Sequence, residues 1–157
     1  MKISKATLFF ILSAVLTTSL GIAAGGRHFK TQLSGKQAVP AVMTKASGEA
    51  FFRLSKNGKE ITFDLKVKGI ENVTAAHIHA GKKDQEGPPV AGLFSGPEKR
   101  GMFSGELAKG TITDKDLVGP LAGKSIPDLV AMIKSGEAYV NVHTARYPNG
   151  ELRGQIH

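Results

Sequence analysis

The chain has 157 residues, a formal net charge of +8 and no cysteine. The absence of cysteine excludes disulfide bonds, thiolate metal sites and a lipid anchor on cysteine. The 21 basic residues are scattered rather than clustered, which argues against a nucleic-acid-binding protein and indicates a solvated basic surface that attracts anionic cell-surface polymers.

Residues 1–25 have the order of segments that is typical of a secretory signal peptide. A basic start with Lys2 and Lys5 precedes an uncharged apolar run at 6–22, and small residues follow. The alternative is a retained leader that anchors the chain, and we expect membrane contact only through such an uncleaved leader. Cleavage would remove both lysines, lower the formal charge from +8 to +6 and leave residues 26–157 as one secreted or periplasmic domain of about 130 residues.

Most of the remaining sequence has the period-two alternation of half-buried strands. The clearest case is residues 60–67, where apolar and polar side chains alternate without a break. Asn57-Gly58 predicts a tight hairpin turn before this strand, and residues 147–150 predict a second turn. In chain order, the predicted strands are 28–33, 48–55, 60–67, 74–80, 90–94, 102–112, 138–144 and 151–156.

One helix is predicted near residues 126–135. Ser125 and Asp128 suit its N-terminal cap, and Pro127 suits its first turn. The apolar residues that follow have the spacing of a buried stripe. A shorter helical turn is predicted at 113–118. Many short strands with one late helix predict a mostly β fold, an antiparallel Greek-key sandwich or barrel.

The segment AHIHAG carries two histidines that flank one isoleucine. On a strand, His77 and His79 point to the face opposite Ile78, about 6.5–7 Å apart. On the strand 138–144, the alternation of apolar side chains puts His143 on the corresponding outer face. If the two strands are neighbours, the three imidazoles converge and can hold one metal ion.

Nitrogen ligands without thiolate favour divalent copper or zinc, and copper is favoured where both are available. Water can supply a fourth ligand, and the side-chain candidates for that position are His157, Asp84 and Glu86. The candidates for hydrogen bonds that orient the rings are Asn141, Glu151 and Gln155. His28 suggests a separate copper site, because cleavage after Gly25 would place it third from a free amine.

Four segments of the chain resemble the CHRD domain, the module named after chordin. The resemblance covers residues 30–157, although Ala38 stands where an acidic residue is usual and Ala41 where a second proline is common. It implies a β-rich, immunoglobulin-like or barrel domain of an extracellular or exported microbial protein, and it implies no reaction. The four segments are Leu33-Ser34-Gly35 with Val39-Pro40, Thr74 to His79 with Gly81, Tyr139 to Thr144, and Tyr147 to Ile156.

A looser likeness to Cu/Zn superoxide dismutase rests on a His-x-His strand and a later histidine on a Greek-key barrel. The chain lacks the cysteine pair, a bridging histidine and a histidine-rich zinc loop. A shared scaffold would therefore not imply shared catalysis.

Three functions are open on these observations. The first is an exported binding domain that holds copper or zinc on the three-histidine face and loses it below about pH 6, as the imidazoles protonate. The second is a metal-free extracellular protein-interaction or envelope module, in which the histidines only pack. The third is an enzyme, such as a copper redox catalyst resembling superoxide dismutase. We assign no catalytic residue, because the chain has no Gly-x-Ser-x-Gly elbow, phosphate loop or His-Glu-x-x-His helix.

Overall fold

The computed structural model describes residues 26–157. The predicted signal peptide, residues 1–25, lies outside the described residues. Within the described part of the chain, no helix has both the length and the apolar character that crossing a membrane requires. The main elements are β1 His28–Ser34, β2 Ser47–Leu54, β3 Ile61–Ala80, β4 Pro89–Phe94, β5 Lys99–Ile112, α1 Ile126–Lys134, β6 Ala138–Thr144 and β7 Leu152–Gln155. Short 3-10 helices occur at η1 Gly35–Gln37, η2 Asp114–Asp116 and η3 Gly119–Leu121.

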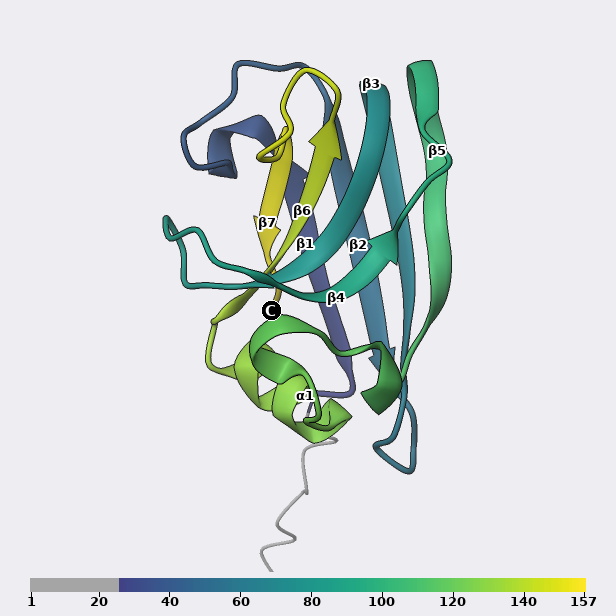
Figure 1. Ribbon diagram of the computed structural model, residues 1–157, viewed down its shortest axis with the longest axis vertical. Helices are drawn as coiled ribbons and strands as arrows, with labels where there is room; N and C mark the ends of the chain where they lie inside the picture. The colour runs from purple at the N-terminus through teal and green to yellow at the C-terminus, as the bar shows by residue number, and fades with distance from the viewer. Residues whose placement is uncertain (1–25) are drawn as a thin grey trace, which may run out of the picture.

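The strands form a closed antiparallel barrel. Hydrogen-bonded neighbours follow the order β2–β1–β7–β6–β3, and β3 pairs with β2 again, which completes a ring of five strands. β4 and β5 pair with β3 outside this ring, and α1 lies at the lower end of the barrel in Figure 1. These observations confirm the predicted mostly β antiparallel barrel with one short helix.

β3 is a single strand of 20 residues where the sequence predicts two, at 60–67 and 74–80. Its first half pairs with β2 and β5, and its second half pairs with β6 and β4. Register shifts lie between the halves, where Gly69 and Asn72 have positive φ angles of 63° and 52°. The chain therefore passes through bulges and continues as one strand instead of ending and starting again.

These bulges change which side of β3 faces the core. Ile61, Leu65 and Val67 are buried in the first half, whereas Ala76 and Ile78 are buried in the second. Each bulge adds a residue without a partner on the opposing strand, so the alternation restarts in the opposite phase. As a result, the odd-numbered residues of the second half lie on the outer face of the barrel.

α1 begins at the predicted cap. The Ser125 N–H and Oγ–H both donate to Asp128 Oδ2, at 2.8 and 2.6 Å, and they form a capping box. The predicted turn at 113–118 is η2, which Thr113 and Asp116 cap in the same way. The helix buries an apolar stripe against the core, made of Ile126, Leu129, Val130 and Ile133.

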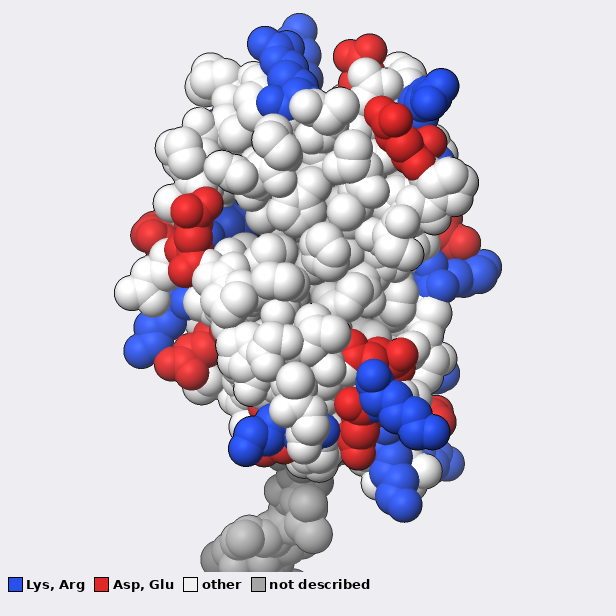
Figure 2. All heavy atoms as spheres, viewed as in Figure 1, with Lys and Arg blue, Asp and Glu red and all other residues white. Residues whose placement is uncertain are grey.

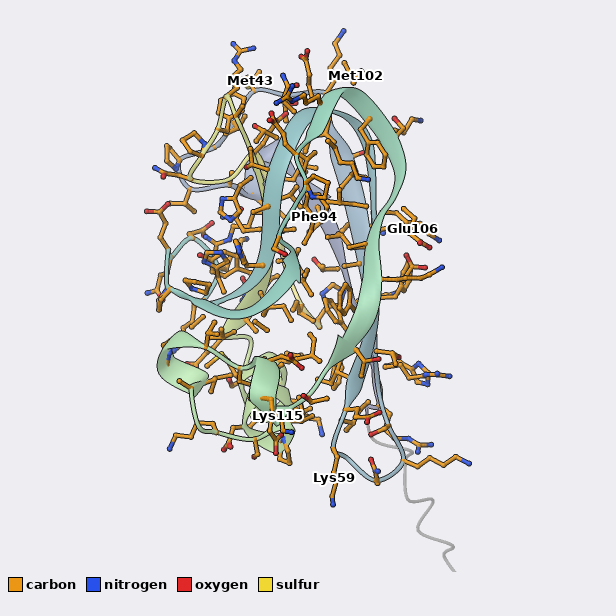
Figure 3. All side chains as sticks on the ribbon, turned by 45° about the vertical axis from the view of Figure 1, so that its right-hand side comes forward. Met43, Lys59, Phe94, Met102, Glu106 and Lys115 are labelled. Atoms are coloured by element: carbon orange, nitrogen blue, oxygen red, sulfur yellow. The ribbon has the colours of Figure 1, made fainter. Side chains whose placement is uncertain are left out.

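β5 pairs with β3 alone among the described residues, so its other edge faces no strand. Gly101 and Gly105 interrupt this edge with positive φ angles of 74° and 139°. Figure 3 shows Met102, which is 70% exposed, and Met43, which is 94% exposed, at the upper end of the molecule.

The barrel closes where β7 meets β1. Ser34 pairs with Arg153, and the backbones of Lys30 and His157 exchange hydrogen bonds of 2.8 and 3.1 Å. At Gly154 the two strands approach so closely that a Cβ atom would collide with the carbonyl oxygen of Gln32 and the hydroxyl of Thr31. Only glycine fits this position without a shift of the backbone.

We expect Gly154→Ala to destabilise the protein by about 1–3 kcal/mol, because the added methyl group forces β1 and β7 apart. Chemical unfolding followed by circular dichroism measures this change. The matched control is Gly92→Ala in β4, where a Cβ atom meets nothing within 4 Å, and its effect should stay within about 0.5 kcal/mol. Equal stability of the two variants would contradict the close approach.

Candidate metal centre

Three histidines lie together on the outer face of β3 and β6. Strand pairing sets His79 opposite Tyr139 and His143 opposite Ala75, which leaves His143 diagonally across from His77. Residues in such diagonal positions are within reach of each other when their side chains are long. The two strands are thus neighbours, as the converging site requires.

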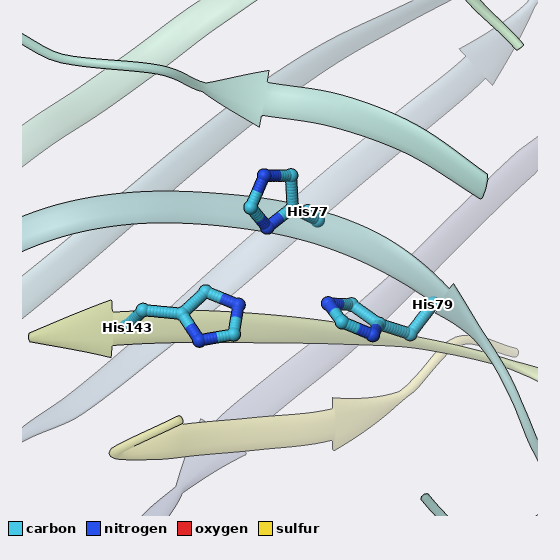
Figure 4. Close-up of side chains that lie close together, drawn as sticks. All are labelled: His77, His79 and His143. Carbon is cyan, nitrogen blue, oxygen red and sulfur yellow. The ribbon is translucent and has the colours of Figure 1, made fainter. Parts of the chain in front are cut away.

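The three rings face one another (Figure 4). The ring centroids of His77 and His143 are 5.2 Å apart, and those of the other two pairs are 5.6 Å apart. One ring nitrogen of each histidine lies within 4.8 Å of the others. A tetrahedral ion with bonds of about 2.0–2.1 Å spaces its ligand nitrogens by about 3.3 Å. A movement of about 1 Å per ring, or less, therefore brings the nitrogens to bonding distance.

Two backbone carbonyl groups determine the tautomers of His79 and His143. Nδ1 of His79 lies 2.8 Å from the carbonyl oxygen of Gly87, and Nδ1 of His143 lies 2.9 Å from that of Pro148. A carbonyl oxygen only accepts, so each Nδ1 carries the proton and donates it. Each Nε2 therefore keeps a free lone pair, the form in which a metal ligand is usually held.

Each ring has one buried nitrogen without a hydrogen-bond partner. These atoms are Nδ1 of His77, Nε2 of His79 and Nε2 of His143. A buried polar group that lacks a partner costs about 1–3 kcal/mol, and nearly all such groups in folded proteins are paired. Three such nitrogens in one cluster form a set of candidate ligands for a metal ion.

Burial lowers the pKa of all three imidazoles. The pKa of His77 falls to about 4, mainly because the ring is desolvated and further because a charged His143 or His79 would repel it. Desolvation also lowers the pKa of His79 and of His143, although the hydrogen bonds to Gly87 and Pro148 act in the opposite direction. At neutral pH the rings are neutral, which is the protonation state that binds a metal ion.

Tyr139 and Arg153 support the ring of His79. The rings of Tyr139 and His79 are stacked at 5.3 Å, and the Arg153 guanidinium carbon lies 3.6 Å from the Tyr139 ring centroid. The Tyr139 hydroxyl accepts a hydrogen bond of 3.1 Å from the Gly87 N–H. Tyr139 is 2% exposed and Arg153 is 3% exposed, so the stack is part of the folded interior beside the site.

A pocket of about 460 Å³ adjoins His79 and His143, and the loop 81–88 and the turn 147–150 contribute to its walls. Its lining includes Glu86, a candidate fourth ligand, although Glu86 does not belong to the group of ligand atoms that lie within 4.8 Å of one another. In Figure 2 the middle of the visible face carries no charged side chain, and the charged residues gather along its rim. In Figure 1, which has the same view, β4, β3 and β6 lie on this face.

The other candidate ligands lie elsewhere. Asp84 lines a different pocket, together with Arg153. His157 and His28 line a groove with Phe51, and neither belongs to the three-histidine cluster found in the described residues.

Asn141 acts on His143 through the turn 147–150. Its Nδ2 donates to the carbonyl oxygen of Asn149 at 2.9 Å. The preceding residue, Pro148, provides the carbonyl oxygen that accepts from His143. Asn141 therefore orients this ring indirectly, by holding the turn in place.

Gln155 and Glu151 also hold backbone segments near the site. Nε2 of Gln155 donates to the carbonyl oxygen of Gly81 at 2.9 Å, at the start of the loop 81–88. Glu151 accepts from Thr44 at 2.7 Å and from Thr144 at 2.9 Å. In the described chain neither residue hydrogen-bonds to a histidine ring.

The carbonyl groups of Gly87 and Pro148 and the role of Tyr139 are contacts that the sequence does not predict. A backbone carbonyl has no residue signature that a motif could reveal. Their closeness in sequence to the histidines is the one hint that these segments contact the rings. The polar loop 81–88 directly follows the histidine strand, and the predicted turn 147–150 follows His143.

A comparison with protein families finds the CHRD domain at residues 29–156. No curated protein and no solved structure matches the chain. The matched residues include all three histidines and the two segments that hold them.

We expect the metal-free protein to lose stability as the pH falls from about 6.5 to about 4. In this window the unfolded chain binds a proton at His77 that the folded chain does not bind, so acid favours unfolding. The stabilisation is complete above pH 6.5 and is lost towards pH 4. Because the ring is only half-buried, we discount its contribution to the order of 1–2 kcal/mol.

Chemical unfolding at pH 7 and at pH 4.5 measures this loss. His77→Gln should reduce the difference between the two pH values, whereas the exposed control His157→Gln should keep it. An NMR titration in which the His77 imidazole of the folded protein protonates near pH 6.5 would contradict the expectation.

Proposed function

The chain belongs to the CHRD family, and we propose that it is an exported domain that binds one divalent copper or zinc ion through His77, His79 and His143. The observation that carries the proposal is the cluster of three buried ring nitrogens without hydrogen-bond partners. The signal-peptide pattern of residues 1–25 supports export to the periplasm or the cell exterior.

A bound ion would give each of the three nitrogens a partner. In a metal-free interaction module the same atoms stay buried and unpaired, at about 1–3 kcal/mol each. The hydrogen bonds from His79 to Gly87 and from His143 to Pro148 are the kind of outer contact that metal-ligating histidines make, because they hold the ring and leave the ligating nitrogen free.

The donor set decides the class of metal. Three imidazole nitrogens without thiolate suit zinc or divalent copper rather than calcium or magnesium, which prefer oxygen ligands. Glu86, on the wall of the adjoining pocket, or water completes the coordination. Three protein ligands with an accessible fourth position allow an external group to bind the ion.

Metal binding to the mature chain, residues 26–157, tests the proposal. We expect isothermal titration of the metal-free protein, and elemental analysis after the protein has been loaded with metal and desalted, to give one zinc or copper ion per chain. His77→Ala should weaken binding by more than about 100-fold, because it removes a ligand rather than an outer contact. The matched controls His157→Ala and His28→Ala should keep the affinity, and His28→Ala also tests the amino-terminal copper site. Wild-type uptake no greater than that of a variant without the three histidines would refute the proposal.

The low pKa values also predict how binding depends on pH. Protons compete with the metal only when an imidazole is basic enough to hold them. Since the pKa of His77 lies near 4, we expect binding to persist below the usual imidazole pKa of about 6.5 and to fall as the pH approaches about 5. Titrations at intervals between pH 4.5 and 7.5 give this profile, and a midpoint near 6.5 would disagree with it.

Asn141→Ala should lower the metal affinity by about tenfold, because it releases the turn that holds His143. Isothermal titration measures the affinity, and a melting curve confirms that the variant is folded. Asn57→Ala, in the hairpin turn between β2 and β3, is the control and should bind as the wild type does. An unchanged affinity in folded Asn141→Ala would show that the turn does not support the ligand.

A further inference from the structure

Arg153 lines a second polar pocket, of about 250 Å³, whose lining includes none of the three clustered histidines. Three segments contribute to it: η1, the loop 81–88 and β7. It contains three cationic side chains and a single carboxylate, so two positive charges are left without a counter-charge in the pocket. The lining residues are Lys36, Gln37, Lys83, Asp84, Arg153 and Gln155.

Arg153 is the buried cation of this pocket. It is 3% exposed, and its hydrogen bond runs from Nη2 to the carbonyl oxygen of Lys82 at 2.8 Å. Among the described residues, no carboxylate comes within the 4.0 Å of an ion pair with it. A guanidinium has five N–H donors in a rigid fork, and a buried charge without a partner is costly.

The surroundings only partly compensate this charge. Burial lowers the pKa of Arg153, and Tyr139, Asp84 and Glu86 act in the opposite direction without cancelling the effect. The stack on Tyr139, at 3.6 Å, holds the plane of the guanidinium. An anion with oxygen atoms would supply acceptors for the N–H groups of Arg153 other than the one that donates to Lys82.

The wall of the pocket is held in place before any ligand binds. Gln155 Nε2 donates to the carbonyl oxygens of Gly81 and Gly136, at 2.9 and 2.8 Å. The Arg153–Lys82 hydrogen bond fixes the next residue of the loop. Lys36 and Lys83 are exposed, so they can reorient towards a ligand. The Arg153 guanidinium is already held in place, so only the side chains of Lys36 and Lys83 lose conformational entropy when an anion binds.

We infer that this pocket binds a small divalent oxyanion, of the size and charge of phosphate or sulfate. Arg153 offers paired N–H donors to two oxygen atoms, and Lys36 and Lys83 neutralise the remaining charge. The excess of positive charge in the pocket favours a divalent anion over a monovalent carboxylate. None of the three metal-ligating histidines lines the pocket, so the site does not require a bound metal.

The test uses the metal-free mature chain, so its outcome is separate from that of metal binding. Amide shifts in ¹⁵N NMR are followed while sodium phosphate, sulfate or acetate is added in separate titrations at constant ionic strength. We expect saturable shifts at residues 35–37 and 81–85 with phosphate or sulfate. Acetate should bind at least about tenfold more weakly, and the phosphate and sulfate titrations identify which divalent anion fits better.

Two double variants with the same loss of charge provide the matched comparison. Lys36→Gln with Lys83→Gln should raise the dissociation constant by at least about tenfold. Lys59→Gln with Lys115→Gln, at the lower end of the molecule in Figure 3, should leave it within about twofold. Arg153→Lys keeps the charge but loses the planar fork, and we expect about tenfold weaker binding. The lysine variants lie on the surface and decide the test even if Arg153→Lys does not fold.

Three results would overturn the inference. The first is a response that does not saturate and spreads over the basic surface. The second is acetate binding as tight as that of phosphate and sulfate. The third is an equal loss of binding in the two double variants, which would make the effect one of net charge alone.

Discussion

The change of phase within β3 is the constraint on which the three-histidine cluster, the candidate metal centre, depends. Val67 faces the core and so does Ile78, although an uninterrupted strand would put these two residues on opposite faces. The register shifts around Gly69 and Asn72 absorb the difference. Without them, either the first half of β3 would expose its apolar row or the second half would bury two imidazoles among aliphatic side chains, at a high desolvation cost.

The cluster also depends on two backbone segments that the fold itself holds in place. The loop 81–88 is tied to β7 by Gln155 and Arg153, and it holds the ring of His79 through Gly87. The turn 147–150 holds His143 through Pro148. Both rings are therefore oriented by parts of the fold that do not bind metal, which lowers the entropy cost of assembling the site. The same loop lines the pocket that we infer to bind an oxyanion, so one polar segment contributes to both proposed sites.

The fold class, the helix cap and the outward direction of the histidines could be predicted from the sequence, because each follows from local periodicity. Ile78 between two histidines determines their face once the segment is a strand. The continuity of β3 could not be predicted, because Gly69 interrupts the alternation and a bulge and a turn look alike at that level. The hydrogen bonds from the rings to Gly87 and Pro148 depend on where loops lie in space. The burial of Arg153 likewise follows from tertiary contacts with Lys82 and Tyr139, which no spacing of residues reveals.

The outer edge of β5 affects how the protein behaves in crowded solution. An edge of 14 residues offers backbone donors and acceptors to any other strand, and a flat edge of that length would let molecules stack into fibrils. Gly101 and Gly105 interrupt the extended backbone with positive φ angles, and the strand carries charged side chains such as Lys99, Arg100 and Lys109, which disfavour pairing with another strand. The open edge of β5 therefore does not offer a straight template for edge-to-edge pairing between molecules.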